Sequence, residues 1–244
     1  PWVFAQAIER VEGAPAPGDA VDVRDPHGKH VGRGFWSPDS AIPVRLVTRR
    51  EEEALDDLAI VRRLELAKTR RERLGLPNQE TDGYRLVHAE GDDLPGLIVD
   101  IYADVAVVQL LTIGMKRREE VIYGALSRVA KARVVAEAPG GAGPKREGIE
   151  AEPRIVRGPT IEHLSFRERG FVYEIELARA QKTGFYFDQR DNRALVERLA
   201  KDRRVLDLYS YVGPFSLAAA RGGARSVHAF DSNAGVVRAA AAAA

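Results

Sequence analysis

Hydrophobic and polar residues alternate along residues 1–48, and this alternation predicts several short β-strands. The segments that carry the pattern are VDVRD, VGRGFWS and AIPVRLVTR, and DPHGKH has the composition of a turn. Together they indicate a small β-barrel. From residue 51 onward, the first Gly is Gly75 and the first Pro is Pro77. We therefore expect a helix over 51–75 that joins this barrel to the rest of the chain.

Residues 82–175 have the pattern of a second, mixed unit. Its expected strands are YRLVHAEG, LPGLIVDIYADVAVVQLL with a tight turn at Ala103-Asp104, RVVAEA, and FVYEIEL in a hairpin with residues 162–167. Residues 116–130 predict an amphipathic helix, because Ile122, Leu126 and Val129 recur at helical spacing. PGGAGPKREG at 139–148 is rich in Gly and Pro and predicts a loop.

The last part of the chain has a different order of elements. A helix is expected over NRALVERLAKD, with Leu195 and Leu199 on one face, followed by a short buried strand at 205–208. A loop, a helix that starts near Pro214 and a strand that ends at Asp231 come next. Strand, loop, helix, strand and acid in this order are typical of the first half of a Rossmann-like unit.

Composition narrows the class of protein. A length of 244 residues with 45% apolar residues suggests about two globular domains. The absence of Cys excludes disulfides and thiolate metal sites within these residues, and we predict no metal. No apolar run of 18 residues and no signal peptide are visible, so we expect a cytoplasmic protein without a membrane partner. The chain begins at Pro1 and ends in Ala239–Ala244, so we expect both ends to be incomplete and leave open whether the alanine run is native.

Charge is balanced overall but uneven along the chain. The net charge of +1 argues against strong general attraction to nucleic acid. Residues 62–73, RRLELAKTRRER, nevertheless carry six basic and two acidic side chains. One interpretation is a solvated helix face with Leu64, Ala67 and Leu74 buried, and the other is a helix that contacts phosphates.

The segment QKTGFYFDQRDNR at 181–193 combines aromatic, charged and amide side chains just before an apolar strand. This mixture is typical of a binding-site surface that contacts a ligand with one flat part and one polar part. Phe185 and Phe187 are expected to lie in the core, and Arg193 is expected to pair with an acid on its own helix.

The loop DLYSYVGPF indicates which ligand this is. Dinucleotide sites use G-x-G-x-x-G, whereas this loop has a single Gly and Pro214 removes one amide donor. S-adenosylmethionine has no phosphate, and Asp207, Ser210 and Gly213 suit it better, with Asp231 18 residues after Gly213 to accept ribose hydroxyls. The alternative is a plain βαβ unit with an acid placed there by chance.

These residues carry a resemblance to a known family. QKTGFYFDQRDNR followed by VLDLYSYVGPFSLAAARGGARSVHAFDSN resembles the RlmI-type family of 23S rRNA cytosine methyltransferases, class I enzymes that use S-adenosylmethionine. PWVFAQAIERVEG with GRGFWSPDSAIPVRLVTR resembles their PUA domain, an RNA-binding barrel, and YRLVHAEGDDLPGLIVDIYAD resembles their central domain.

The resemblance implies a multidomain α/β and α+β fold. We expect a PUA-like barrel at 1–50, a linking helix at 51–80, a central α+β domain at 81–178, and the N-terminal part of a Rossmann-like methyltransferase domain at 179–244. The chain departs from the family pattern at Pro214, where a second Gly is usual, and at the loop 139–148.

The resemblance also assigns site residues. Those expected to bind S-adenosylmethionine are Lys182, Thr183, Tyr186, Asp188, Arg190, Asp207, Ser210, Gly213, Phe215, Asp231 and Ser232. Those expected to bind RNA are Trp2, Arg33 and Arg45. The implied partner is naked or partly assembled large-subunit rRNA, and a homodimer is left open.

The implied reaction is methylation of cytosine at carbon 5. This chemistry needs a Cys thiolate that adds to carbon 6, and we expect that residue beyond position 244. The alternatives are methylation of guanine by a related enzyme, an RNA-binding or ribosome-assembly factor on an inactive methyltransferase fold, and a nucleotide-dependent oxidoreductase, which the loop sequence disfavours.

Overall fold

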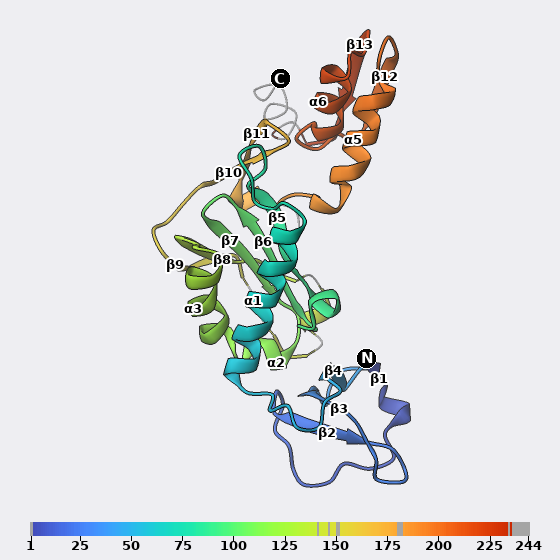
Figure 1. Cartoon of the computed structure of the whole chain (residues 1–244), viewed down its shortest axis with the longest axis vertical. Coiled ribbons are helices and arrows are strands. Elements are labelled where there is room, and N and C mark those ends of the chain that lie inside the picture. The colour runs from blue at the N-terminus through green and yellow to red at the C-terminus, as the bar shows by residue number, and fades with distance from the viewer. Residues whose placement is uncertain are drawn as a thin grey trace. The chain divides into compact units, whose positions relative to one another are not determined.

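The computed structural model describes residues 2–140, 142–145, 147–149, 152–179, 183–233 and 235 (Figure 1). The chain divides into two compact units. Unit 1 comprises residues 1–76 and 85–160, and unit 2 comprises residues 77–84 and 161–244.

The N-terminal part of unit 1 is a four-stranded antiparallel sheet of order β1-β4-β3-β2. Its elements are β1 (Trp2–Val3), the short 3-10 helix η1 (Ala5–Ala7), β2 (Ala20–Arg24), β3 (His30–Trp36) and β4 (Val44–Thr48). The strands expected at VDVRD, VGRGFWS and AIPVRLVTR are therefore confirmed. Phe35 and Val44 are buried where β3 and β4 pair.

Helix α1 (Asp57–Arg73) follows this sheet. It starts later than residue 51 because the Asp56 side chain caps it, accepting a hydrogen bond of 2.8 Å from the Ala59 amide. Ile60, Leu64 and Ala67 lie on its buried face. Leu74 was expected on the same face, but it lies past the helix end and is 75% exposed.

The rest of unit 1 is built on a five-stranded mixed sheet of order β5-β6-β7-β8-β9. Its elements are β5 (Gly83–His88), whose first two residues are counted with unit 2, η2 (Ala89–Asp92), β6 (Leu97–Tyr102), β7 (Val105–Leu110), β8 (Val134–Glu137) and β9 (Arg154–Arg157). Both central strands β6 and β7 are buried along their whole length. Helix α1 lies beside α3 (Glu119–Val129) on one face of this sheet (Figure 1).

Two expectations for this sheet's connections were wrong in detail. The helix expected over 116–130 is split into α2 (Ile113–Lys116) and α3, and Arg117 and Arg118 separate them. The loop expected at 139–148 contains a short helix, α4 (Ala142–Lys145). Ile122, Leu126 and Val129 are buried on α3 as predicted.

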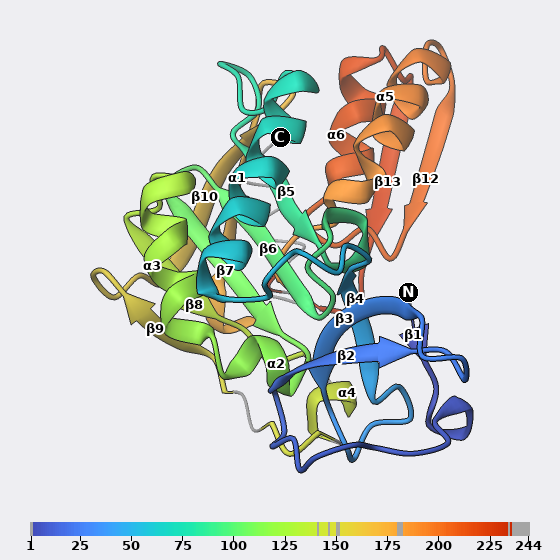
Figure 2. The same cartoon turned by 60° about the horizontal axis from the view of Figure 1, so that its bottom comes forward.

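Unit 2 contains an antiparallel hairpin and a parallel strand pair. Its elements are β10 (His163–Glu168), β11 (Phe171–Glu176), η3 (Leu177–Arg179), η4 (Phe187–Gln189), α5 (Arg190–Leu199), β12 (Arg204–Leu208), α6 (Pro214–Arg221) and β13 (Ser226–Phe230). Helix α6 packs against both parallel strands, and α5 lies beside α6 (Figure 2). The predicted start of a Rossmann-like unit is confirmed.

The apolar residues of β12 are placed differently from the prediction, and the face of α5 that carries its leucines is exposed. Leu206 and Leu208 are exposed, so β12 is not a buried strand, and the helices cover only its other face. Leu195 and Leu199 are also exposed on α5, where Arg193 is the buried residue. Among the described residues, no helix combines the length and apolar character needed to cross a membrane.

Candidate functional site

The loop between β12 and α6 has an unusual backbone. Tyr209 and Tyr211 have φ angles of 60° and 51°, and Gly213 has a φ of 74° at the N-cap of α6. Left-handed backbone is costly for residues with a Cβ, and such strain gathers at ligand-binding sites. Pro214 is the first residue of α6, where its missing amide hydrogen leaves no helical hydrogen bond unmade.

Asp231 stands directly after β13 and faces this loop. One carboxylate oxygen accepts a hydrogen bond of 2.9 Å from the Tyr211 amide, and the other accepts one of 2.9 Å from the Asn233 amide. The side chain is partly exposed. Each carboxylate oxygen can accept a second hydrogen bond, so Asp231 can bind two hydroxyl groups while the backbone holds it in place.

Two further side chains lie at the end of β12. Asp207 accepts a hydrogen bond of 2.6 Å from the Ser216 hydroxyl on α6. The Ser210 hydroxyl is buried, and no described residue offers it a hydrogen-bond partner. An orphaned hydroxyl in a strained loop is a place where a polar ligand group supplies the missing bond.

Tyr211 joins the loop to the block that follows residue 182. Its hydroxyl donates a hydrogen bond of 2.7 Å to the Gly184 carbonyl, and its ring lies edge-on to Tyr186 with ring centres 6.0 Å apart. The two sequence segments that were expected to share a ligand are therefore in contact. Phe185 and Phe187 are buried, which confirms their assignment to the core.

A buried ion pair contacts the segment that follows residue 182. Arg193 on α5 donates from Nε and Nη2 to the Glu168 carboxylate of β10, at 2.7 and 2.8 Å, and both side chains are 2% exposed. It also donates to the Tyr186 carbonyl at 3.1 Å. The expected pair with an acid on its own helix was wrong, because the partner comes from the hairpin 25 residues earlier.

The other predicted cofactor residues have varied surroundings. Thr183 is buried, Phe215 lies under the Arg193 guanidinium at 5.9 Å, and Ser232 is exposed. Asp188 is exposed, and Arg190 bonds to Glu168 and to the Gly83 carbonyl. Lys182 lies outside the described residues. The cofactor roles of these residues stay predictions.

The predicted RNA-binding residues lie in unit 1. Trp2 is 50% exposed, and its indole nitrogen donates to Glu90 at 2.8 Å. Arg33 bonds to Asp22, and Arg45 bonds to Glu147 at 3.0 Å. Both arginines therefore donate hydrogen bonds within the protein. Among these three residues, Trp2 offers the large exposed aromatic surface.

Sequence inspection missed three residues of the site: Tyr211, Ser216 and Glu168. The sequence DLYSYVG does not distinguish Tyr211, which is buried, from Tyr209, which is 88% exposed. Ser216 and Glu168 gave no signal, since their partners become clear only when α6 and β10 are placed.

The polar groups around this loop fit S-adenosylmethionine. Asp231 offers paired acceptors for ribose hydroxyls, and the buried Ser210 hydroxyl lacks a partner that a polar end of the cofactor would supply. No group of three His, Cys, Asp or Glu side chains suited to a metal ion occurs within the described ranges.

Two family models match the chain. A PUA-like domain matches residues 1–49, and an S-adenosylmethionine-dependent methyltransferase matches residues 85–242. The second match includes the loop 209–213 and Asp231.

Curated relatives extend the match over nearly the whole chain. The protein from Tolumonas auensis named ribosomal RNA large subunit methyltransferase I is 40% identical over 93% of this chain. The protein of the same name from Alteromonas mediterranea is 39% identical over 95%. The chain spans 57% and 58% of these two relatives.

Solved structures share the fold. A methyltransferase crystallised with SAH superposes with a TM-score of 0.82 and 20% identity, over 99% of this chain and 60% of the other. An S-adenosylmethionine-dependent methyltransferase from Streptococcus mutans gives a TM-score of 0.80 with 20% identity, over 99% and 61% of the two chains. The predicted combination of a PUA-like domain with a Rossmann-like methyltransferase fold is thereby confirmed.

Proposed function

Because the chain belongs to the S-adenosylmethionine-dependent methyltransferase family, we propose that its protein transfers a methyl group from S-adenosylmethionine to large-subunit ribosomal RNA. The names of the curated relatives support this substrate. The PUA-like domain at residues 1–49 is consistent with an RNA partner.

The arrangement of Asp231 against the β12–α6 loop carries the cofactor assignment. Ligands of open α/β sheets bind beyond the carboxyl ends of the strands, and Asp231 and Ser210 both lie there. Asp231 would accept both ribose hydroxyls, and Ser210 would bond a polar end of the cofactor. The sulfonium group of the bound cofactor supplies an activated methyl group. The protein's part is to orient that group and to exclude water.

The aromatic residues at the loop suit the flat part of the cofactor. Tyr186 is half-buried and meets the buried Tyr211 edge-on, and we assign the adenine to the side of Tyr186 because flat aromatic groups pack well on one another. Phe215 and Ser232 flank the loop at the start of α6 and after Asp231. We therefore assign the adenine and ribose to the carboxyl end of β13.

For the target base we propose cytosine, methylated at carbon 5. The motif at 181–193 supports this choice through its resemblance to cytosine methyltransferases, and methylation of guanine is the alternative. Addition of a thiolate to carbon 6 would activate carbon 5, and these 244 residues contain no Cys. We therefore assign no catalytic nucleophile to any residue of this chain.

Calorimetry with S-adenosylmethionine tests the cofactor site. We expect Asp231→Ala in the full-length protein to weaken binding about a hundredfold, because it removes two hydrogen bonds to a charged acceptor, each worth about 1.5 kcal/mol. The matched control is Asp202→Asn, an exposed residue of the same unit whose left-handed backbone tolerates Asn.

The outcomes separate the candidate functions. Equal affinity of Asp231→Ala and the control would refute the ribose assignment. No binding by the intact protein would refute the enzyme and favour a non-catalytic RNA-binding factor. If binding is confirmed, the protein is used to methylate rRNA from a deletion strain. Digestion of that rRNA and mass spectrometry then distinguish 5-methylcytosine from a methylated guanine.

A further inference from the structure

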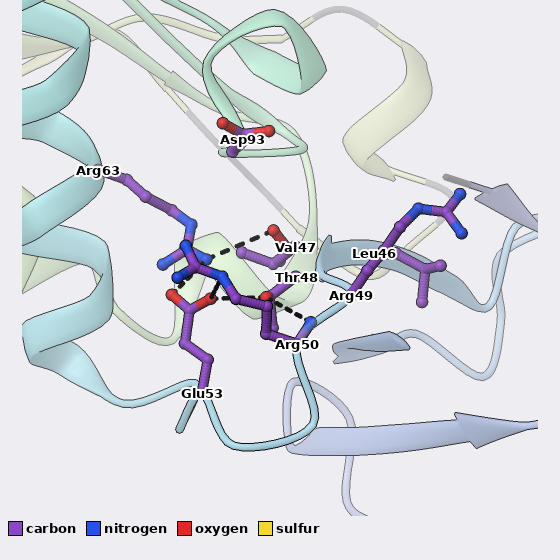
Figure 3. Close-up of a pocket in the computed structure, with 8 residues that line it drawn as sticks. All are labelled: Leu46, Val47, Thr48, Arg49, Arg50, Glu53, Arg63 and Asp93. Atoms are coloured by element: carbon purple, nitrogen blue, oxygen red, sulfur yellow. Dashed lines mark hydrogen bonds and ion pairs between the residues drawn. The ribbon is translucent and has the colours of Figure 1, made fainter. Parts of the chain in front are cut away.

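Unit 1 contains a pocket where β4 leads into α1, and none of its lining residues is among those assigned to the cofactor (Figure 3). Its volume is about 320 Å³. The lining residues come from the end of β4, the turn after it, α1 and the segment after η2: Leu46, Val47, Thr48, Arg49, Arg50, Glu53, Arg63 and Asp93. This is enough room for a phosphate group with part of its sugar.

Glu53 organises the charges in this pocket. Its carboxylate accepts hydrogen bonds from Arg63 at 2.7 Å and from the Thr48 hydroxyl at 2.6 Å, and the Arg50 Nε lies 3.6 Å away. Burial alone would raise the pKa of Glu53, but the hydrogen bonds from Thr48 and Arg63 outweigh it and lower the pKa. Glu53 is therefore an anion shared between two guanidinium groups.

Two guanidinium groups on one carboxylate leave donors unused. Figure 3 shows the ends of Arg50 and Arg63 gathered over Glu53. Arg63 is 7% exposed, and its Nε is buried without a partner among the described residues. Arg50 is largely exposed, and its contact with Glu53 is longer than a hydrogen bond.

Arg49 also lines the pocket, and its guanidinium points away from Glu53, Arg50 and Arg63 (Figure 3). Its side chain is exposed and makes no hydrogen bond or ion pair with any residue in the described part of the chain. Of the two lining acids, Glu53 is shared as above and Asp93 is bonded to Arg70 at 3.1 Å. Three arginines against two engaged carboxylates give an excess of positive charge, which suits a phosphate because guanidinium forks match its oxygens.

An exposed aromatic pair adjoins the segment that forms the pocket's far wall. Trp2 and Phe4 are both exposed and meet edge-on with ring centres 6.4 Å apart. The Trp2 indole bonds to Glu90, three residues before Asp93 of the pocket. Exposed rings and a basic pocket in the same unit are typical of single-stranded RNA binding, where bases stack on the rings and phosphates bind the cations.

We propose that this pocket binds a backbone phosphate of RNA through Arg49, Arg50 and Arg63. The identification of RNA as the source of the phosphate rests on the proposed function. The pocket's chemistry alone would also accept free phosphate or a nucleotide, so the experiment includes that source.

The test measures binding of a short labelled single-stranded RNA to the full-length protein by fluorescence anisotropy. The variant is Arg49→Ala/Arg50→Ala, because both side chains are exposed and their removal leaves the Arg63–Glu53 pair intact. We expect its Kd to rise about tenfold. The slope of log K against log salt should become shallower by about 0.7, because the variant neutralises one phosphate fewer. The matched control, Arg10→Ala/Arg73→Ala, removes two exposed arginines that do not line the pocket.

Each outcome decides the proposal. Equal RNA affinity of the two double variants would overturn it. If inorganic phosphate binds the parent protein and not Arg49→Ala/Arg50→Ala, while RNA affinity does not change, the pocket takes free phosphate and the RNA assignment fails. Calorimetry with S-adenosylmethionine distinguishes failure of the pocket proposal from failure of the proposed methyltransferase function. The pocket variant should retain cofactor binding, and a protein that binds RNA through the pocket but never binds the cofactor would refute only the methyltransferase.

Discussion

Arg193 is a buried cation that connects three parts of unit 2. Its guanidinium bonds to Glu168 on β10 and to the Tyr186 carbonyl, and it lies over the Phe185 ring at 4.8 Å. A planar group with five donors can make all these contacts at once, whereas an ammonium group cannot. Arg193 therefore holds Tyr186 in the position from which it meets Tyr211.

We predict that Arg193→Lys destabilises unit 2 and weakens cofactor binding. The substitution keeps the charge but leaves the Glu168 carboxylate, which is 2% exposed, short of partners. Breaking a buried pair costs about 3–5 kcal/mol, and the retained charge reduces this loss to about 2–3 kcal/mol. Urea unfolding measures the stability, and calorimetry at a temperature where the variant is folded measures the affinity.

Arg190→Lys is the matched control, since Arg190 shares Glu168 but is partly exposed. We expect it to lose about 1 kcal/mol or less. If Arg193→Lys were as stable as this control, and bound S-adenosylmethionine as tightly as the parent, the positioning role of Arg193 would be wrong.

At the scale of the element, α1 shows how a basic helix can be used internally. Arg71 and Arg70 bond to Asp92, and Arg63 bonds to Glu53, so much of the basic stretch at 62–73 is matched by acids of unit 1. The helix was predictable from its lack of Gly and Pro. The choice between a solvated face and phosphate contacts was not, because the acids that meet these arginines lie in other segments of the chain.

Asp92 is the buried anchor of this helix. It accepts hydrogen bonds from both Nη atoms of Arg71 and, at 2.7 Å, from the His88 amide. Burial alone would raise the pKa of Asp92, but the hydrogen bonds from Arg71, the His88 amide and Arg70 outweigh it and lower the pKa. A lowered pKa means that Asp92 stabilises the fold above its unfolded pKa of about 3.9, and that this stability is lost as the pH falls through the lower folded pKa.

We predict that Asp92→Asn lowers the free energy of unfolding of unit 1 by about 3 kcal/mol at pH 7. This is the lower end of the range for a broken buried pair, because Arg70 and Arg71 keep contact with solvent. The deficit should be the same at pH 5 and should shrink below about pH 4, because the unfolded chain then binds a proton at Asp92 that the folded protein takes up only at lower pH. Urea unfolding at several pH values measures both effects.

The matched control is Asp93→Asn. Asp93 is exposed, pairs with Arg70 and has a left-handed backbone that Asn adopts readily. We expect it to cost less than about 1 kcal/mol. A deficit for Asp92→Asn that stayed constant down to pH 3 would show that its carboxylate charge is not the cause.

At the scale of the whole molecule, the order of helices and strands was predictable from the sequence. The solvent exposure of several apolar side chains was not. Local pattern predicted the strands β2, β3 and β4 and the hairpin β10–β11, because these depend on alternation and turn residues. The order strand, loop, helix, strand predicted the parallel pair β12–β13. Leu206 and Leu208 looked buried because an apolar strand of an α/β sheet is usually covered on both faces. In the candidate site, Asp231 was predictable from its spacing, whereas Glu168 was not, since nothing local identifies a partner 25 residues away.

The division into two units gives the last prediction, which concerns where the cofactor stabilises the protein. Thr183, Asp231 and the loop between β12 and α6 all belong to unit 2. A ligand that binds only the folded state, at a hundredfold excess over its Kd, stabilises that state by about 2.7 kcal/mol. We therefore expect S-adenosylmethionine to slow hydrogen exchange about a hundredfold for unit 2 amides that exchange by unfolding of the unit, and to leave unit 1 unchanged.

Residues 77–84 provide the sharpest marker, because they lie between two segments of unit 1 in the sequence but belong to unit 2. The Asp82 amide donates to the Arg167 carbonyl at 3.1 Å, so it should become protected together with the hairpin β10–β11. Amides of α1 and β6 should keep their rates, and Asp231→Ala should show no protection in either unit. Equal slowing of both units in the parent protein would mean that they unfold as one block, and the cofactor would then stabilise the whole chain through a single cooperative transition.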